Sequence, residues 1–257
     1  MMDDRAVSET LGFVFAFALV TASVGAVYTT GIGGLQDARE DEQVTNAVRA
    51  MDVLADNVRD VTTADAPSRA TELKLSGATL RYGDPVEIEV QANTTDPDDD
   101  RNATYRTTTR PLVYDAPAGE VVYANGATFR VDDGRAAMRS EPGFVVGEGE
   151  ENTSVVPLVL TYPRGDSGGV GGSGTVLVVA HRQSVELDGR FDTPAESGET
   201  DARINVTVDS PRADAWGRYF EAQGMDRIDH GEGSVTYQFH TDGLVVPEAA
   251  VEFELRH

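Results

Sequence analysis

One uncharged stretch constrains this chain more than any other feature of its sequence. No Asp, Glu, Lys or Arg occurs between Glu9 and Asp37, and the run from Leu11 to Tyr28 is apolar apart from small hydroxyl residues. About 20 apolar residues cross the hydrocarbon core of a bilayer as a helix, and Ser and Thr hydroxyls can bond to the preceding helical turn. The sequence therefore predicts one membrane-spanning helix near the N-terminus.

A cleaved secretory signal is the main alternative for this run. Such a signal has a basic start, a shorter apolar stretch and a site with the pattern small-x-small. Thr21-Ala22-Ser23 resembles such a site, but the apolar character continues beyond it to Tyr28. A segment that is removed does not need this extension, so we expect the helix to be retained.

A second helical pattern follows the apolar run. Gly31, Gly33 and Gly34 weaken the helix by about 1 kcal/mol each relative to Ala, so we expect a kink or an unwound hinge there. Beyond them, residues 36–63 carry apolar side chains at spacings of three and four, which predicts an amphipathic helix that packs on a globular domain. The predicted stripe consists of Val44, Ala47, Val48, Met51, Leu54, Ala55, Val58 and Val61.

Composition excludes several classes of protein. The 257 residues include no cysteine, so disulfides, thiolate metal sites and cysteine nucleophiles are absent. The 44 acidic residues against 21 basic ones give a formal charge of -23, which repels nucleic acid. Lys74 is the only lysine. Acid excess with almost no lysine is typical of proteins that stay hydrated in concentrated salt, so we expect a halophilic archaeal source.

From Thr71 onward the pattern changes to short alternating runs, which predict strands. Asn125-Gly126 is a strong hairpin signal, whereas Ser76-Gly77 and Asp133-Gly134 are weaker ones. Within 210–224, Ser210 as N-cap and Pro211 at the first position predict one inserted helix. We therefore expect an α+β fold, with a long N-terminal helix followed by a mainly antiparallel β-rich domain over 68–257. The predicted strands are 73–75, 86–90, 121–123, 128–131, 155–162, 175–180, 185–187, 204–208 and 235–239.

The segment from Asp4 to Gly12, followed by the apolar run, resembles the N-terminus of haloarchaeal type IV pilin-like proteins, a group that includes archaellins. The resemblance covers roughly the first 60 residues. It implies that a prepilin peptidase removes a short leader, here 1–6, and that the helix over 7–35 stays in the mature protein. Arg5 and Ala6 match the processing site, Val7 is the expected new N-terminus, and Glu9 lies near the acidic residue that many pilins use in assembly.

The resemblance also implies partners and a location. The expected partners are membrane lipid, the prepilin peptidase and other pilin subunits, with the bulk of the chain outside the cytoplasm. Ser8-Glu9 replaces the Ser-Pro that is usual in this group, the leader is short, and the globular part is large. These departures favour a minor subunit of structural or adhesive function. A permanently anchored binding protein of the cell envelope remains the alternative, because hydropathy alone does not separate the two.

Four sequons would be glycan acceptors if the bulk of the chain is exported. Their asparagines are Asn93, Asn102, Asn152 and Asn205. The first two flank the acidic loop 96–100, whose composition places it at the surface. Asn205 falls in a predicted strand, so its side chain would have to face solvent.

Several strings look catalytic, but none has the required context. The string around Ser167 matches that of trypsin-like proteases, but in those the histidine precedes the serine, and all four histidines here follow Ser167. The same string is also a G-x-S-x-G, which in a hydrolase elbow leads into a helix, whereas a strand is predicted after it here. The G-x-G-x-x-G string over 169–174 also leads into that strand, not into a phosphate-binding helix. In the acidic loop, Arg101 occupies the glycine position of a calcium loop. We therefore predict no catalytic residue, no cofactor and no metal site.

Overall fold

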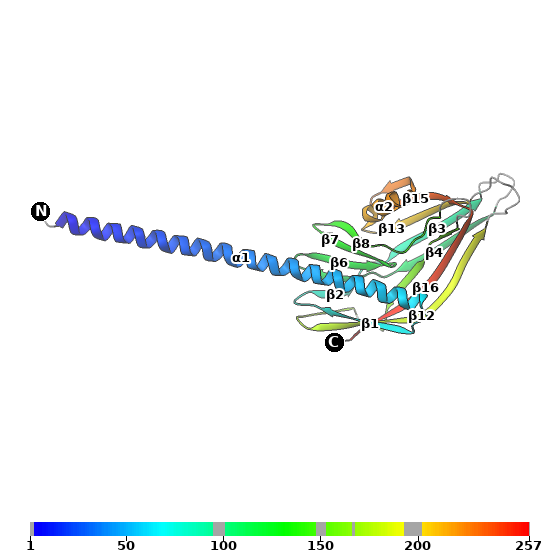
Figure 1. Ribbon diagram of the computed structural model, residues 1–257, viewed down its shortest axis with the longest axis horizontal. Helices are drawn as coiled ribbons and strands as arrows, with labels where there is room; N and C mark the ends of the chain where they lie inside the picture. The colour runs from blue at the N-terminus through cyan, green and yellow to red at the C-terminus, as the bar shows by residue number, and fades with distance from the viewer. Residues whose placement is uncertain (1–2, 95–100, 148–152, 166–167, 193–201, 257) are drawn as a thin grey trace. The chain divides into compact units, whose positions relative to one another are not determined.

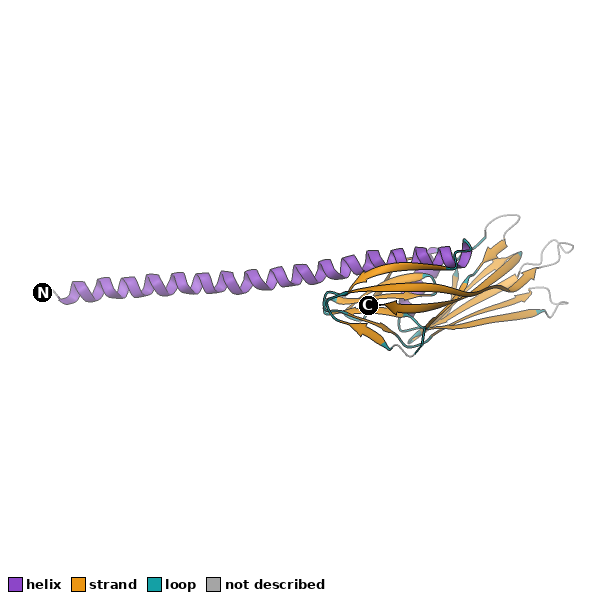
Figure 2. Cartoon of the chain, turned by 90° about the horizontal axis from the view of Figure 1, so that it is seen from below, coloured by secondary structure: helices purple, strands orange, loops and turns teal. Residues whose placement is uncertain are grey.

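The computed structural model describes residues 3–94, 101–147, 153–165, 168–192 and 202–256. The chain divides into two compact units, residues 1–43 and residues 44–257. Helix α1 (Asp3–Thr63) supplies the described part of the first unit and the beginning of the second. The remainder of the second unit consists of strands and one further helix (Figure 2). The expected α+β class, with a long N-terminal helix before a mainly antiparallel β-rich domain, is confirmed.

The strands of the second unit form three sheets (Figure 1). Sheet A contains β1 (Ser68–Lys74), β12 (Thr175–Asp192), β16 (Gly243–Arg256), β10 (Leu158–Pro163) and β9 (Thr153–Val155). Sheet B contains β11 (Gly169–Gly171), β2 (Thr79–Tyr82), β5 (Leu112–Ala116), β6 (Gly119–Ala124), β7 (Ala127–Asp132) and β8 (Arg135–Ser140). Sheet C contains β14 (Asp226–Gly231), β15 (Ser234–Thr241), β13 (Ala202–Asp209), β3 (Val86–Thr94) and β4 (Asn102–Thr109). Among the described pairs of named strands, only β9 and β10 pair in parallel, each with β16.

Sheet B lies between two hydrophobic cores because its strands bury side chains on both faces. The first core, called the α1 core below, contains Tyr114 and Tyr123 together with the predicted stripe of α1 and side chains of sheet A. Val113 and Val122 are the chain neighbours of these tyrosines and point to the opposite face of the sheet. They belong to the second core, called the α2 core below, with side chains of sheet C and of helix α2 (Ala213–Ala222). Alternation with period two therefore allows one sheet to serve both cores.

The amphipathic half of α1 folds as its sequence predicts. All eight stripe residues are buried, from Val44 to Val61. The residues of this stripe are also members of the α1 core, so this part of the helix is an internal element of the β-rich domain. The expected unwinding at Gly31, Gly33 and Gly34 does not occur, and α1 continues through them. Each glycine costs about 1 kcal/mol relative to Ala but keeps its backbone N–H and C=O, so the hydrogen bonds of the helix are not interrupted.

The inserted helix differs from its prediction at its start. Helix α2 begins at Ala213, and its N-cap is Arg212, which makes no side-chain cap hydrogen bond. Ser210 instead accepts a bond from the backbone N–H of Arg212 at 3.1 Å, which stabilises the turn before the helix. The predicted aromatic face, Trp216, Tyr219 and Phe220, is buried in the α2 core as expected.

All nine predicted strand runs fall in strands, with changes at their ends. Residues 175–180 and 185–187 belong to one long strand, β12, whereas 155–162 is divided between β9 and β10. The Asn125-Gly126 turn joins β6 to β7 with both residues at positive φ, 47° and 80°. These are the dihedrals that a two-residue hairpin turn of type I′ requires.

Candidate functional site

The apolar segment of α1 is the largest exposed apolar feature among the described residues. Phe13, Phe15 and Leu19 are each 72% exposed, and none of the apolar window is buried within the chain. The helix is long and apolar enough to cross a membrane. Exposure of many contiguous large apolar side chains to water is unfavourable, so this surface needs an apolar environment.

Hydroxyl groups within this segment are bonded to their own helix. Thr21 Oγ1 donates to the carbonyl of Phe17 at 2.8 Å, and Ser23 Oγ donates to the carbonyl of Leu19 at 2.7 Å. Thr30 Oγ1 likewise donates to the carbonyl of Ala26 at 2.8 Å. Because an unsatisfied hydroxyl is costly in an apolar medium, these bonds lower the cost of burying the segment in lipid.

The predicted processing residues lie at the beginning of α1. The backbone of Arg5, Ala6, Val7 and Glu9 is helical, but their side chains lie outside the described ones. The leader site and the assembly role of Glu9 therefore remain predictions from the resemblance.

The predicted glycan acceptors differ in their surroundings. Asn93 and Asn102 face each other across the β3–β4 pair, and Asn102 is exposed. Asn205 lies on the outward face of β13, between Gln91 and Gln238 of the neighbouring strands, and its Oδ1 is buried without a hydrogen-bond partner. Asn152 lies outside the described residues. The geometry thus favours Asn102 as an acceptor over Asn205.

The catalytic look-alikes are not assembled into a site where the structure describes them. Ser167 and the acidic loop 96–100 lie outside the described residues. Gly169 begins β11, and the glycine run leads into strand β12, as the sequence predicts, so no helix N-terminus follows it. His181 bonds Glu254 and His230 bonds Asp214, and the described part of the chain contains no group of three His, Asp or Glu side chains that could hold a metal ion.

One apolar hollow lies where α1 meets the loops after β6 and β8. Its volume is about 120 Å³, and its lining includes Val58, Tyr123 and Pro157. Burial raises the pKa of Tyr123, and a contact with the backbone of Gly126 offsets this only in part. Pockets that bind small molecules are usually about 300–1,000 Å³, so this hollow is a packing defect rather than a substrate site.

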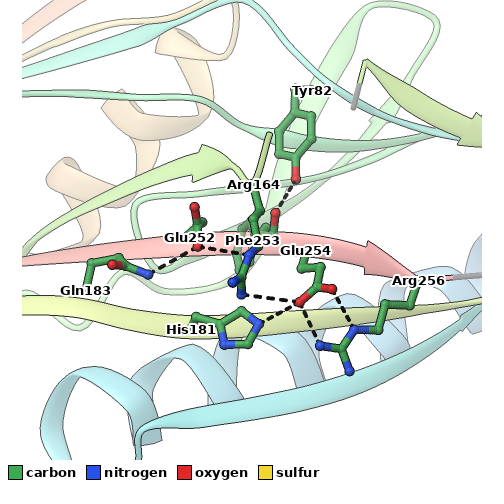
Figure 3. Close-up of polar contacts among 8 residues, drawn as sticks. All are labelled: Tyr82, Arg164, His181, Gln183, Glu252, Phe253, Glu254 and Arg256. Atoms are coloured by element: carbon green, nitrogen blue, oxygen red, sulfur yellow. Dashed lines mark hydrogen bonds and ion pairs between the residues drawn. The ribbon is translucent and has the colours of Figure 1, made fainter. Parts of the chain in front are cut away.

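A charged cluster on sheet A was not predicted from the sequence (Figure 3). Glu254 on β16 accepts from Arg256 at 2.8 Å and contacts His181 Nε2 on β12 at 2.9 Å, while Arg164 approaches it at 3.4 Å. Arg256 and then His181 hold the pKa of Glu254 at about 2. Arg164 and Arg256 are 92 positions apart in the chain, and the pairing of β16 with both β12 and β10 brings the residues together.

The same cluster connects two sheets. Tyr82 of β2 donates its hydroxyl to the carbonyl of Phe253 at 3.0 Å, and burial raises the pKa of this phenol (Figure 3). Glu252 accepts from Gln183 at 3.2 Å. Each charged group has a partner, and the cluster lies on a strand surface rather than in a cavity. The ion pairs connect neighbouring strands of sheet A, and the bond from Tyr82 joins β2 of sheet B to β16 of sheet A.

Comparison with known proteins adds one family. No curated protein matches the chain. A crystal structure of the ywiB protein from Bacillus subtilis matches with 13% sequence identity over 61% of this chain and 89% of that one, with a TM-score of 0.14. That likeness is too low to support an argument. A family model matches residues 5–254, nearly the whole chain, and on this basis the protein belongs to DUF7289, a family of unknown function.

Proposed function

We propose that this protein is a pilin-like cell-surface protein of a haloarchaeon, with a structural or adhesive role and no catalytic activity. A prepilin peptidase removes residues 1–6, and the apolar helix then anchors the mature chain in the membrane. The protein can be drawn from the membrane into a type IV pilus-like filament as a minor subunit. Membrane lipid, the peptidase and other pilin subunits are its partners.

One observation carries this proposal: the two parts of α1 have opposite surroundings. Large apolar side chains from Leu11 to Leu35 are exposed, whereas the stripe from Val44 to Val61 is buried in the core of the β-rich domain. A helix that is retained in the mature protein needs both parts, one for lipid or neighbouring helices and one for its own domain. A cleaved signal needs neither the exposed residues beyond Ser23 nor continuity with a core helix.

The test compares a processing variant with a matched control in the native host. Arg5→Glu reverses the charge before the proposed cut, and Arg39→Glu makes the same change beyond the apolar segment. We expect Arg5→Glu to keep its leader, to remain in membranes and to disappear from surface structures recovered by shearing. Arg39→Glu should be processed and sheared like the wild type.

Equal behaviour of the two variants, with every form confined to membranes, would contradict the filament role. It would favour the anchored binding protein of the cell envelope, which requires the helix but neither the cut nor release into a filament.

A further inference from the structure

A second hollow lies at the start of α2. Its volume is about 410 Å³, and it is open to solvent between the β7–β8 turn and the first turn of the helix. Three arginines from different elements meet around it: Arg135 begins β8, Arg212 precedes α2, and Arg218 lies within α2. The full lining is Gly134, Arg135, Ala136, Pro211, Arg212, Asp214 and Arg218.

These arginines differ from several others of the domain, which form ion pairs with carboxylates. Arg81, for example, bonds Glu120 at 3.0 Å. None of Arg135, Arg212 and Arg218 forms an ion pair with a described residue. Arg218 donates to the backbone carbonyl of Ala136. In a chain of formal charge -23, this hollow brings three guanidinium groups together.

Arg212 is the innermost of the three. Its Nε is buried and has no hydrogen-bond partner. Burial lowers the pKa of this guanidinium, although the nearby carboxylates of Glu120 and Asp84 partly offset the effect. The Nε itself is closed to solvent, so an anion in the hollow acts on the half-buried Arg212 side chain through its charge, which offsets the cost of burying this cation.

Two further features of the hollow act in opposite directions. Asp214, its one acidic lining residue, opposes an anion through its own charge, although its Oδ1 contacts His230 Nε2 at 2.8 Å. Helix α2 starts here without a side-chain cap, and the N-terminus of a helix carries a partial positive charge that attracts anions. Guanidinium forks bind planar or tetrahedral oxyanions through two bonds at once, which a halide does not allow.

We propose that this hollow is a binding site for a doubly charged oxyanion of the phosphate or sulfate class. The exposed side chains of Arg135 and Arg218 bind the anion from the solvent side of the hollow, and the half-buried Arg212 binds it from the protein side. The site is independent of the proposed filament role, because it depends only on the folded β-rich domain.

The test measures anion binding to the purified full-length chain in detergent micelles. Inorganic phosphate and inorganic sulfate are titrated calorimetrically at constant potassium chloride. We expect saturable binding by the wild type and a loss of affinity of about tenfold in Arg135→Ala, whose side chain is exposed. Circular dichroism checks that this variant folds. Arg212→Gln is the second variant, and circular dichroism checks that it folds.

The matched control is Arg139→Ala, which removes an exposed arginine from the same strand, β8, but outside the hollow. Its affinity should equal that of the wild type. Absence of saturable binding in the wild type would overturn the proposal. An equal loss in Arg139→Ala and Arg135→Ala would also overturn it, because the effect would then come from net charge alone.

Glucose 6-phosphate and glucose 6-sulfate distinguish the sources of the anion. Tighter binding than that of the inorganic ions would identify an ester group on a larger ligand, and equal binding would identify the free ion. Both results support the site. Neither depends on leader processing, so the failure of this proposal is distinguishable from the failure of the proposed function.

Discussion

Asp52 is a single residue that ties α1 to sheet B. Its Oδ1 accepts hydrogen bonds at 2.7 Å from both Thr128 Oγ1 and Ser140 Oγ, which lie on β7 and β8. Asp52→Ala leaves both hydroxyls without this acceptor, so we expect the free energy of unfolding to fall by about 2 kcal/mol. Urea denaturation of the full chain measures the change.

Asp56→Ala is the control for this prediction. Asp56 lies one turn further along the same helix, and its only described ion pair, with Arg59, is exposed. Exposed pairs contribute little, so we expect a loss below about 0.5 kcal/mol. Similar losses in both variants would show that Asp52 has no special bonding role.

Gly126 combines two constraints at the β6–β7 turn. Its φ is +80°, and an added Cβ would lie 3.2 Å from the carbonyl oxygen of Pro142. Gly134 has a similar φ of +75°, but an added Cβ would meet nothing within 4 Å. We expect Gly126→Ala to destabilise the domain by about 1 kcal/mol more than Gly134→Ala, since both incur backbone strain and only the first adds a contact. Thermal unfolding of the two variants compares them, and equal midpoints would contradict the prediction.

Glu254 is expected to make the free energy of unfolding depend on pH in the acid range. Its pKa is lowered from 4.5 to about 2 in the folded chain, chiefly by Arg256 and then His181. A lowered pKa means that the charged carboxylate stabilises the fold, and this contribution is present above pH 4.5 and lost as the pH falls toward 2. Glu254→Gln should therefore lose stability at neutral pH and converge with the wild type near pH 2. Denaturation at a series of pH values measures this.

Glu72→Gln supplies the comparison, since Glu72 is an exposed carboxylate of β1 in the same sheet. We expect its difference from the wild type to be small throughout the series. A constant difference between Glu254→Gln and the wild type from pH 7 to pH 2 would contradict the assigned role of Glu254.

At the scale of elements, the second half of α1 behaves as a core helix. Leu54 is fully buried in the α1 core, whereas its neighbour Val53 is 52% exposed. Leu54→Ala should destabilise the domain by about 3 kcal/mol, and Val53→Ala by less than about 1 kcal/mol. Chemical denaturation measures both, and a comparable loss at Val53 would show that the stripe is placed on the wrong face of the helix.

Elements with strong local patterns could be predicted, and those with weak ones could not. The stripe of α1, the aromatic face of α2 and the Asn125-Gly126 turn were all predicted because each has its own local cause. Strands β4 and β14 were missed because β4 is rich in Thr and every residue of β14 is exposed, so neither shows apolar alternation. β16 was missed because Pro247 interrupts its pattern, near a bulge of its partner β12.

The candidate sites also differ in whether they could be predicted from the sequence. The apolar segment could be found from sequence because all of its residues are contiguous. The cluster around Glu254 and the arginines around the α2 hollow could not be found, because each joins residues from separate strands or helices. Arg135 and Arg218 are 83 positions apart, and no local pattern marks them as neighbours.

At the scale of the whole molecule, the formal charge of -23 predicts a response to salt. Repulsion among carboxylates destabilises the folded domain at low ionic strength, and at 1 M salt the screening length falls to about 3 Å. The thermal midpoint of the full chain in micelles should therefore rise between 0.1 M and 3 M potassium chloride. A midpoint that falls or stays constant over this range would contradict the interpretation of the acidic composition as an adaptation to salt.

The central claim is that the leader is removed while the apolar helix is retained. Mass spectrometry of the mature N-terminus, from both membranes and sheared surface fractions, tests it most directly. We predict a chain that begins at Val7, or at Ala6, in both fractions. A chain that begins at Met1 or Met2 and occurs in membranes alone would contradict the pilin-like account and leave a simple anchored ectodomain.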